Sequence, residues 1–546
     1  MPATKPLEPQ KLHRIVFATS AGTIFEAYDF ILFGSLAPII SAKFFAGVNE
    51  TASFVIALLI FASGYFIRPA GALFFGSMGD RKGRKKAFVI TITMMGLATF
   101  GIGLLPTYAT VGILAPIMLI VLRLIQGLAF GGEYGGAVVY AAEYAPPDKR
   151  GFYVGWIQAA AGFAVFLSFF IIYLTRTVLG EAAFIDWGWR IPFLISIFLL
   201  GISLWIRLSL EESPLFQKLL ADGKASKRPL SEAFGEWPNL KLVMLVLLGL
   251  LMLQGVVFYT AHFYSQFFIT QILKLPAAKM TLIMMIATAC SVPLYVLFSW
   301  LSDRWGRKRM AQLGAALMLA LLLPIFQGFT AVVSPALAAA QQNAPVVVTA
   351  DPLGCSLQFD PVGRAQFSSS CDIAKSSLAI LGISYSNAEG SPETLALVTI
   401  GDKTLPSVDG GGLSATELTR VRSDFRAKLS TELLAAGYPP QVQPESVNML
   451  ALGSLMLLLI VLSTLVYSIT PIMALEMFPT QIRYSALSLP YHIGSGWFGG
   501  FLPAIVFAMV AANGSIYFGL WYPLVIISIS LVVLSFAIPE TRSRDL

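Results

Sequence analysis

The sequence predicts an all-α membrane protein made of two homologous six-helix halves, and three observations support that prediction. Hydrophobic residues make up 56% of the 546 residues and charged residues only 12%, with a mean hydropathy of +0.74. This balance suits a protein dissolved in lipid better than a soluble globule. Twelve apolar runs, each of about 20 residues, are long enough to cross a ~30 Å hydrocarbon core as helices. A basic, glycine-containing turn follows the second run and again the eighth, which indicates a duplicated unit.

The first six apolar runs form an N-terminal bundle, which we expect at residues 1–210. These runs start near Ile15, Thr51, Ala87, Thr110, Gly151 and Trp187. The first run is too long for the apolar core of a signal peptide, and no small-residue cleavage site follows it. We therefore expect it to remain as the first span.

The remaining six runs form a C-terminal bundle, after a central cytoplasmic loop at residues 211–239. They start near Leu240, Lys279, Met310, Val447, Ala486 and Ser515. The bundle therefore occupies residues 240–330, with helices seven to nine, and residues 447–546, with helices ten to twelve. A polar insert at residues 331–446 separates these two parts.

Lys and Arg residues gather in the even-numbered loops, whereas the short odd-numbered loops are nearly free of them. Because short basic loops stay in the cytoplasm, we expect a multi-pass protein of the inner membrane with both termini in the cytoplasm and the insert outside. The same loops account for the formal net charge of +7, so nucleic-acid binding is not indicated.

The repeated turn reads D-R-K-G-R-K at Asp80–Lys85 and D-R-W-G-R-K at Asp303–Lys308. A carboxylate close to guanidinium groups and helix N-termini can make charge-assisted contacts that break when helices move apart. We expect a cytoplasmic gate made of the residues Gly76, Asp80, Gly83 and Arg84, with weaker counterparts in Asp303, Gly306 and Arg307. The second copy has Ser299 where the first has Gly76, so we expect looser helix contact there.

The insert is expected to be a small region outside the membrane. Asp and Glu outnumber Lys and Arg in it by eleven to seven. Ser414 followed by Glu417 matches a capping box, and the apolar residues after it recur at helical spacing until Gly437. Cys355 and Cys371 form a disulfide in an oxidising exterior or remain two free thiols, and the absence of further ligands argues against zinc.

Charged residues within the spans are functional candidates because burying them in lipid is costly. They are confined to the first half: Glu26, Asp29, Arg68, Arg123 and Glu133. By their depth, Asp29 can pair with Arg123, and Arg68 can form a second pair with Glu133. The alternative is that these pairs only hold helices together. The second half offers His262 and His492 instead.

The two turns, the twelve spans and the two-half repeat resemble the major facilitator superfamily, over everything except the insert. Further segments are similar to its metabolite:proton symporter family: Phe25–Phe30, Arg68–Gly71, Arg123–Gly127, Gly131–Gly136, Trp189–Phe193 and Glu476–Ser485. The resemblance implies two six-helix bundles around a central cavity lined by spans one, four, seven and ten. It implies proton-coupling roles for Glu26, Asp29 and Glu133. It also implies substrate-binding roles for Tyr28, Arg123, Gln126, Tyr259 and His262.

The function expected from these features is proton-coupled symport of a small organic acid or zwitterionic metabolite, carried out by a monomer in the lipid bilayer. Its partners are then that small molecule and protons. An efflux or antiport carrier is the first alternative, and a receptor that uses the insert to recognise a partner is the second. No nucleophile–base pair or metal-ligand set is recognisable, so the sequence indicates neither an enzyme nor a cofactor.

Overall fold

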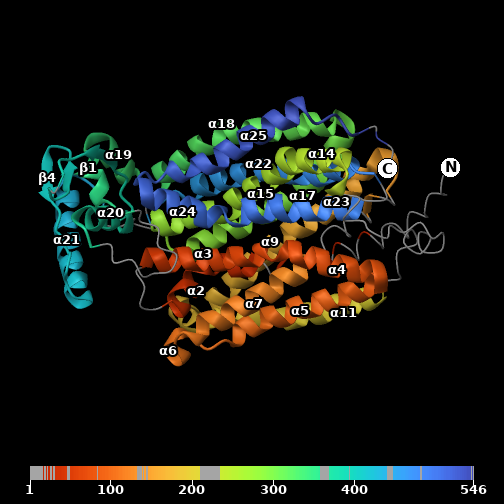
Figure 1. The fold of residues 1–546 in the computed structure, drawn as a ribbon, viewed down its shortest axis with the longest axis horizontal. Helices are drawn as coiled ribbons and strands as arrows, with labels where there is room; N and C mark the ends of the chain where they lie inside the picture. Colours follow the sequence, from red (N-terminus) through yellow and green to blue (C-terminus); the bar gives the residue numbers. More distant parts are fainter. Residues whose placement is uncertain are drawn as a thin grey trace.

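Two stacks of long helices form the body of the molecule, one from each half of the sequence, and a small α/β unit lies at one end of it (Figure 1). The computed structural model describes residues 16, 20, 22–24, 27–28, 31–45, 50–82, 84–131, 138, 141–142, 145–209, 234–356, 368–392, 394–439, 445, 447–479, 483–542 and 544.

The helices of the N-terminal half account for most of its described residues. They are α2 (Ala37–Phe44), α3 (Glu50–Phe66), α4 (Arg68–Lys82), α5 (Arg84–Leu104), α6 (Tyr108–Val111), α7 (Leu114–Phe130), η1 (Pro147–Lys149), α9 (Arg150–Leu179), α10 (Glu181–Ala183), η2 (Phe184–Gly188) and α11 (Arg190–Ser209). The sixth predicted span is bent by 62° between Gly188 and Arg190.

The helices of the C-terminal half include two spans interrupted by π-helical turns. The seventh span runs through α14 (Trp237–Val246), η3 (Leu247–Leu251), α15 (Met252–Tyr259), η4 (Thr260–Tyr264), α16 (Ser265–Phe267) and η5 (Phe268–Ile272). The others are α17 (Ala277–Trp305), α18 (Arg307–Val333), α22 (Met449–Glu476), α23 (Arg483–Tyr491), η7 (His492–Gly499), α24 (Leu502–Asn513), η8 (Phe518–Leu520) and α25 (Trp521–Phe536). Such π turns often occur at functional sites.

Eight helices in the described part of the chain are long and apolar enough to cross a membrane, or nine if the bent pair is one span. Two shorter apolar helices, Val89–Leu104 and Leu114–Phe130, occupy the positions expected for spans three and four. The first predicted span lies partly outside the described residues, so the total of twelve stays a prediction.

The α/β unit between α18 and α22 contains a four-stranded sheet. Its elements are α19 (Pro335–Asn343), β1 (Val346–Ala350), η6 (Pro352–Gly354), α20 (Ser370–Ile380), β2 (Ser386–Glu389), β3 (Leu397–Ile400), β4 (Lys403–Pro406) and α21 (Ala415–Ala435). The strand order is β2-β1-β3-β4, with β1 and β2 parallel and the other pairs antiparallel. Buried residues of β1 and β3, such as Val348 and Val398, share an apolar core with Ile373 of α20 and Leu429 of α21.

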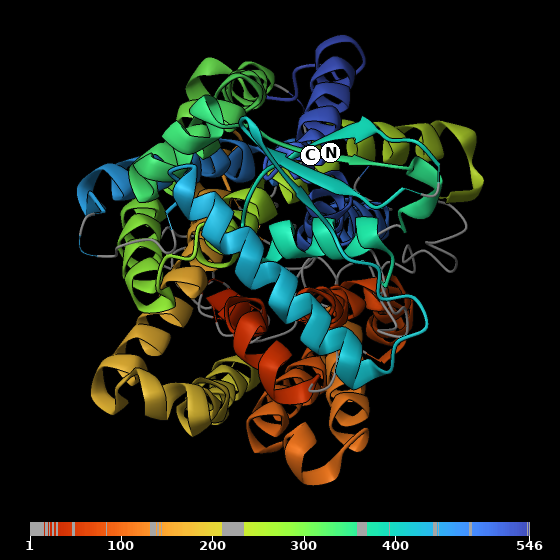
Figure 2. The ribbon, with the colours of Figure 1, turned by 90° about the vertical axis from the view of Figure 1, so that its left-hand side faces the viewer.

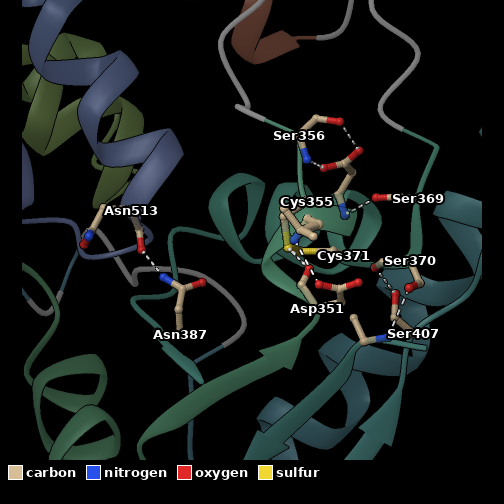
Figure 3. Close-up of a disulfide and its surroundings, with 12 residues drawn as sticks. Asp351, Cys355, Ser356, Ser369, Ser370, Cys371, Asn387, Ser407 and Asn513 are labelled. Carbon is tan, nitrogen blue, oxygen red and sulfur yellow. Dashed lines mark hydrogen bonds between the residues drawn. A yellow bond between two sulfur atoms is a disulfide. The ribbon is translucent and has the colours of Figure 1, made fainter. Parts of the chain in front are cut away.

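Local signals read from the sequence appear in this unit. The capping box at the start of α21 is present, with Ser414 and Glu417 bonding to each other's backbone N–H groups. A disulfide joins Cys355 to Cys371 near the start of α20, which is one of the two alternatives that the sequence left open (Figure 3). The Asp372 carboxylate accepts hydrogen bonds from the N–H and hydroxyl of Ser356 at 2.8 and 2.9 Å, which further ties these segments together.

The α/β unit is anchored to the C-terminal half. The Asn387 side chain donates to the carbonyl of Asn513 at 2.9 Å (Figure 3). The backbone N–H of Tyr385 donates to the carbonyl of Gly514. Gly514 has a φ of +92°, which favours glycine, and the absence of a Cβ leaves room for the Tyr385 ring. In Figure 2, α21 runs across this end of the bundle, in front of helices from the N-terminal half.

Candidate functional site

The two halves meet in the interior of the bundle through aromatic side chains. Phe61 and Tyr65 of α3 face Tyr259 of α15 and Phe263 of η4. The ring centroids of Phe61 and Phe263 lie 5.3 Å apart, and those of Tyr65 and Tyr259 lie 5.4 Å apart. The hydroxyl of Tyr259 donates to the hydroxyl of Tyr65. All four residues are buried. This aromatic contact joins the second span to the seventh.

Arg123 of α7 lies beside this aromatic contact and is completely buried. Its guanidinium donates to Gln126 Oε1 and to the carbonyl oxygen of Phe61, each at 2.8 Å. Its guanidinium carbon lies 4.3 Å from the centre of the Phe33 ring, a geometry in which the ring face attracts a cation. Gln126 is held in turn by donating to Thr99 Oγ1 at 2.6 Å. The spacing of three residues puts Arg123 and Gln126 on one face of the helix.

Arg68 is a second buried cation of the N-terminal half. Its guanidinium carbon lies 4.1 Å from the centre of the Tyr65 ring and 3.7 Å from that of Phe130. Tyr65 is also the partner of Tyr259, so Arg68 is one side chain away from the contact between the halves. The site therefore has two guanidinium groups, both supplied by the N-terminal half.

The C-terminal half supplies ring side chains around Tyr467 of α22. Phe258 stacks on the His262 ring with centroids 4.3 Å apart and lies 4.9 Å from the ring of Tyr467 in α22. The ring of Tyr467 lies 6.0 Å from that of Tyr295 in α17. His262 belongs to the π-helical turn η4, and its Nδ1 donates to the Phe258 carbonyl at 3.0 Å.

His492 links the two halves at a second place. Its Nε2 donates to the carbonyl of Gly131, directly after α7, at 3.0 Å. His492 begins the π-helical segment η7, so both interrupted spans of the C-terminal half have a histidine in their π-helical part. Both histidines thus act here as hydrogen-bond donors to backbone carbonyls.

A cluster of charged groups joins the halves at the end of the bundle opposite the α/β unit. The Asp303 carboxylate accepts hydrogen bonds at 2.9 Å from the backbone N–H groups of Gly151 and Phe152, in the first turn of α9. Arg307 donates to Asp303 at 3.0 Å and binds both oxygens of Glu476, at 2.5 and 2.6 Å. A carboxylate at a helix N-terminus and a bidentate guanidinium pair are both favourable arrangements.

The segment after α25 reinforces this cluster. Glu540 accepts from the backbone N–H groups of Arg307 and Lys308, which caps α18. Arg150 of the N-terminal half donates to the carbonyl of Arg544 at 2.8 Å. The C-terminal segment therefore bonds to both halves.

Comparison with known proteins identifies the family. The model of the sugar (and other) transporter family matches residues 15–238. A shikimate transporter of Escherichia coli K12 is 36% identical over 330 residues, which cover 60% of this chain and 74% of that protein. The chain belongs to the major facilitator superfamily of sugar and metabolite transporters.

Two further relatives and one solved structure are also similar to this chain. A proline/betaine transporter of Escherichia coli K12 is 37% identical over 334 residues, which cover 59% of this chain but only 65% of the relative. A citrate-proton symporter of Klebsiella pneumoniae is 31% identical over 295 residues, or 54% of this chain and 65% of that protein. The structure of a D-xylose-proton symporter superposes with a TM-score of 0.60, at 16% identity, over 98% of this chain and 99% of the other, which shows a shared fold.

The fold brings together Arg123, Gln126 and Tyr259 of the residues expected to bind substrate. His262 is connected to these residues by Phe258, whose ring stacks on the His262 ring and packs against Tyr259. Tyr28 is placed differently, because its hydroxyl donates to the carbonyl of Pro192 in α11, within the N-terminal half. Glu26, Asp29 and Glu133 lie outside the described residues, and their proton-coupling roles stay predictions.

The two copies of the major facilitator turn differ in how much of them the structure describes. Gly83, the surroundings of Gly76 and the side chains of Asp80 and Arg84 lie outside the described part, so the first gate stays a prediction. In the second copy, Gly306 has a φ of +100°, which favours glycine. Because Gly306 has no Cβ, the Glu540 carboxylate can approach its backbone. Asp303 bonds directly to the N-terminal half, and Arg307 holds its carboxylate from within the C-terminal half. The gating role of both residues, expected to be weaker than that of the first copy, stays a prediction.

The expectation of loose helix contact at Ser299 is wrong. Ser299 is buried and donates to the Ser468 carbonyl at 3.0 Å. A Cβ on Gly151 of α9 would lie 2.5 Å from the Ser299 carbonyl oxygen, and a Cβ on Gly155 would lie 2.8 Å from the Ser299 Cβ. Helices α9 and α17 therefore pack closely at Ser299, because α9 supplies glycines where α17 has a serine.

Several site residues were not predicted from the sequence. Phe61, Tyr65 and Tyr467 are aromatic residues in apolar spans, which gave no signal separating them from ordinary core residues. Glu476 had a signal, since it stands at the end of an otherwise uncharged run and begins a segment that resembles the family. Within the described residues, no group of three His, Cys, Asp or Glu side chains is arranged to hold a metal ion.

Proposed function

We propose that this chain takes up a small organic acid or zwitterion together with a proton, by alternating access across the cytoplasmic membrane, as a monomer. The observation on which the proposal depends is the position of Arg123, a fully buried guanidinium beside the aromatic contact between the halves. A buried cation is costly in a low-dielectric interior unless anionic or polar groups surround it. A substrate carboxylate that enters between the halves supplies such a group.

The coupling step links this guanidinium to a proton. When substrate arrives, its carboxylate competes for Arg123 with Asp29 or Glu133, the acids expected to carry the proton. The displaced acid then favours its neutral form and binds a proton, because an unpaired carboxylate is costly in such a cavity. Proton and substrate therefore help each other to bind, with a coupling free energy of typically about 1–3 kcal/mol.

The switching step breaks contacts between the halves. At the end that we assign to the cytoplasm, Asp303 holds the first turn of α9, and Arg150 holds the C-terminal segment. These bonds join the halves at that end, and in this proposal they break for substrate to leave on that side. Relatives named as a citrate-proton symporter and a shikimate transporter fit this reading.

An efflux carrier that exchanges a metabolite or drug for protons is the second candidate. It would use the same fold and the same buried arginine, so the direction of net transport against the proton gradient separates the two. The metabolite:proton symporter resemblance of the first half favours uptake.

The test is transport by the purified full-length protein in liposomes with an acidic exterior. A panel of labelled dicarboxylates, hydroxylated ring acids and proline should include a compound that accumulates above its outside concentration. This accumulation should disappear when a protonophore collapses the pH gradient. The Arg123→Gln variant is the negative control. Net export under the same gradient would favour the efflux candidate, and binding without transport would favour a receptor.

A further inference from the structure

We propose that His492 is a latch between the two halves, which holds the end of α7 while the carrier is closed on its inner side and releases it when that side opens. The inner side is the end that we assign to the cytoplasm. This inference rests on the proposed alternating access and assigns one residue to its switching step. His492 is a positioning residue in this scheme, because it acts on the arginines of the site through the end of α7 and not on the substrate itself.

The hydrogen bond of His492 crosses from one half of the molecule to the other. Its Nε2 donates to the carbonyl oxygen of Gly131 at 3.0 Å, and the side chain is completely buried. The other ring nitrogen, Nδ1, has no hydrogen-bond partner among the described residues, so the Gly131 carbonyl is the partner that orients the ring. A buried donor that loses its partner is costly, and most of all inside a membrane, where water cannot replace that partner. The bond therefore favours the arrangement in which the halves meet at this point.

The acceptor carbonyl is fixed by the N-terminal half. A Cβ on Gly131 would lie 2.1 Å from the carbonyl oxygen of Arg68 and 2.8 Å from the backbone N of Ala72, so the chain after α7 lies directly against α4. The N–H of Gly131 donates to the carbonyl of Gly127 in α7. The Gly131 carbonyl thus moves with α4 and α7, and its bond to His492 must break when the halves part here.

The latch lies on the inner side of the aromatic contact between the halves. Helices α4 and α23 both lie toward the end of the bundle opposite the α/β unit (Figure 1). Arg68 begins α4, and His492 directly follows α23. Gly496, about one turn after His492, already lies against Tyr65, since its Cβ would be 3.4 Å from the Tyr65 ring. An opening that starts at the inner end therefore reaches His492 before it reaches the aromatic contact.

The latch is also next to one of the two buried arginines. The rings of Phe130 and His492 are arranged edge to face with centroids 6.4 Å apart. The centre of the same Phe130 ring lies 3.7 Å from the guanidinium carbon of Arg68. Arg123 lies two turns before Phe130 in the same helix. Release of His492 thus removes a neighbour of the ring that supports Arg68, and it frees the end of the helix that carries Arg123.

The test measures the conformation of the carrier separately from transport. Spin labels are attached to Lys149→Cys and Arg309→Cys, two exposed positions at the inner ends of the two halves. The free Cys290 is replaced by serine. Pulsed electron paramagnetic resonance on the full-length protein in lipid nanodiscs then gives the populations with the inner ends close together and apart. His492→Phe keeps a ring and removes the donor. It should shift the ratio of the two populations about tenfold toward the open state, as expected for loss of one buried hydrogen bond.

Two further variants separate the hydrogen bond from general packing. His492→Gln carries an N–H donor near the position of Nε2 and should restore the wild-type distribution. Ser530→Ala is the matched control, because the buried Ser530 hydroxyl donates to the Leu248 carbonyl at 2.6 Å within the C-terminal half. It loses a hydrogen bond between helices without affecting the contact between the halves, and should leave the distribution unchanged. His492→Leu should reproduce the shift with a smaller side chain if the phenylalanine variant does not fold.

An unshifted distribution in the donor-free variants would overturn the inference. So would a shift of equal size in His492→Gln or in Ser530→Ala. Gradient-driven uptake in liposomes decides the proposed function independently of these distances. A shift in the donor-free variants, in a protein that accumulates none of the tested compounds, would support the latch and contradict the symport. Accumulation without any shift would do the reverse.

Discussion

The repeated turn predicts that the two halves of the bundle come from a duplicated unit, yet the halves contribute different chemistry to the candidate site. The N-terminal half places two guanidinium groups, Arg68 and Arg123, against aromatic rings. The C-terminal half places amide, imidazole and phenol groups there. Its buried ion pairs lie instead at the end of the bundle, where Arg307 is neutralised by Glu476 and Asp303.

The difference separates two uses of buried charge. Arg307 binds two carboxylates of its own half, Asp303 and Glu476, so its charge holds helices together. Arg123 donates to an amide oxygen and a carbonyl oxygen, and we propose that its charge also binds the substrate carboxylate. We propose that the two halves divide a binding role from a locking role.

Replacing Arg123 should have the largest effect on transport. Arg123→Gln keeps a polar side chain but loses the charge-assisted hydrogen bonds to a substrate carboxylate, worth up to about 3 kcal/mol. We expect affinity about a hundredfold weaker, measured by binding to the detergent-purified protein. Arg307→Gln is the comparison, since it should destabilise the fold more than it weakens binding. Equal losses of affinity in the two variants would remove the distinction between the halves.

Replacing Asp303 should have an intermediate effect, on turnover and not on binding. Asp303→Asn retains one oxygen for the α9 N–H groups but loses the charge that Arg307 and the helix N-terminus stabilise. Losing about 1.5 kcal/mol at this contact should change the rate of switching by about tenfold, measured as initial uptake in liposomes. Asp186→Asn is the control, because Asp186 makes an exposed pair with Lys43. Unchanged uptake in Asp303→Asn would argue against a gate at this end.

Removing the hydroxyl contact between the halves should have a small effect. Tyr259→Phe and Tyr65→Phe each delete one partner of the same hydrogen bond and preserve the rings. We expect a change in uptake of about two- to fivefold for each, from a hydrogen bond worth about 1 kcal/mol. The double variant should be no worse than either single one, as a double-mutant cycle would reveal. Additive effects would mean that the two hydroxyls act separately, each on the substrate.

Breaking the disulfide of the α/β unit should affect transport least. Replacing Cys355 and Cys371 by serine removes a cross-link between residues 16 apart, which should lower the local stability by about 3 kcal/mol. Limited proteolysis should then cut the unit faster, while uptake stays at the wild-type rate. Intact-mass measurement after alkylation, with and without reductant, checks the bond itself. Lost uptake in the serine variant would instead give the unit a part in transport.

The sequence by itself determined the positions of most spans, the interruption after α18 and the start of α21. Each of these is a local property. A span needs an apolar run that matches the thickness of the bilayer, and the capping box needs only Ser414 and Glu417 three residues apart. The charged residues of the spans were also recognisable, because their cost in lipid depends on the residue type and not on its neighbours.

Only the tertiary structure decided what those residues contact. Arg123 bonds to a carbonyl 62 residues earlier in the chain, His492 to one 361 residues earlier, and Asp303 to backbone N–H groups on the other half. Such partners depend on which helix faces meet and at what height, and hydrophobic patterning does not specify either.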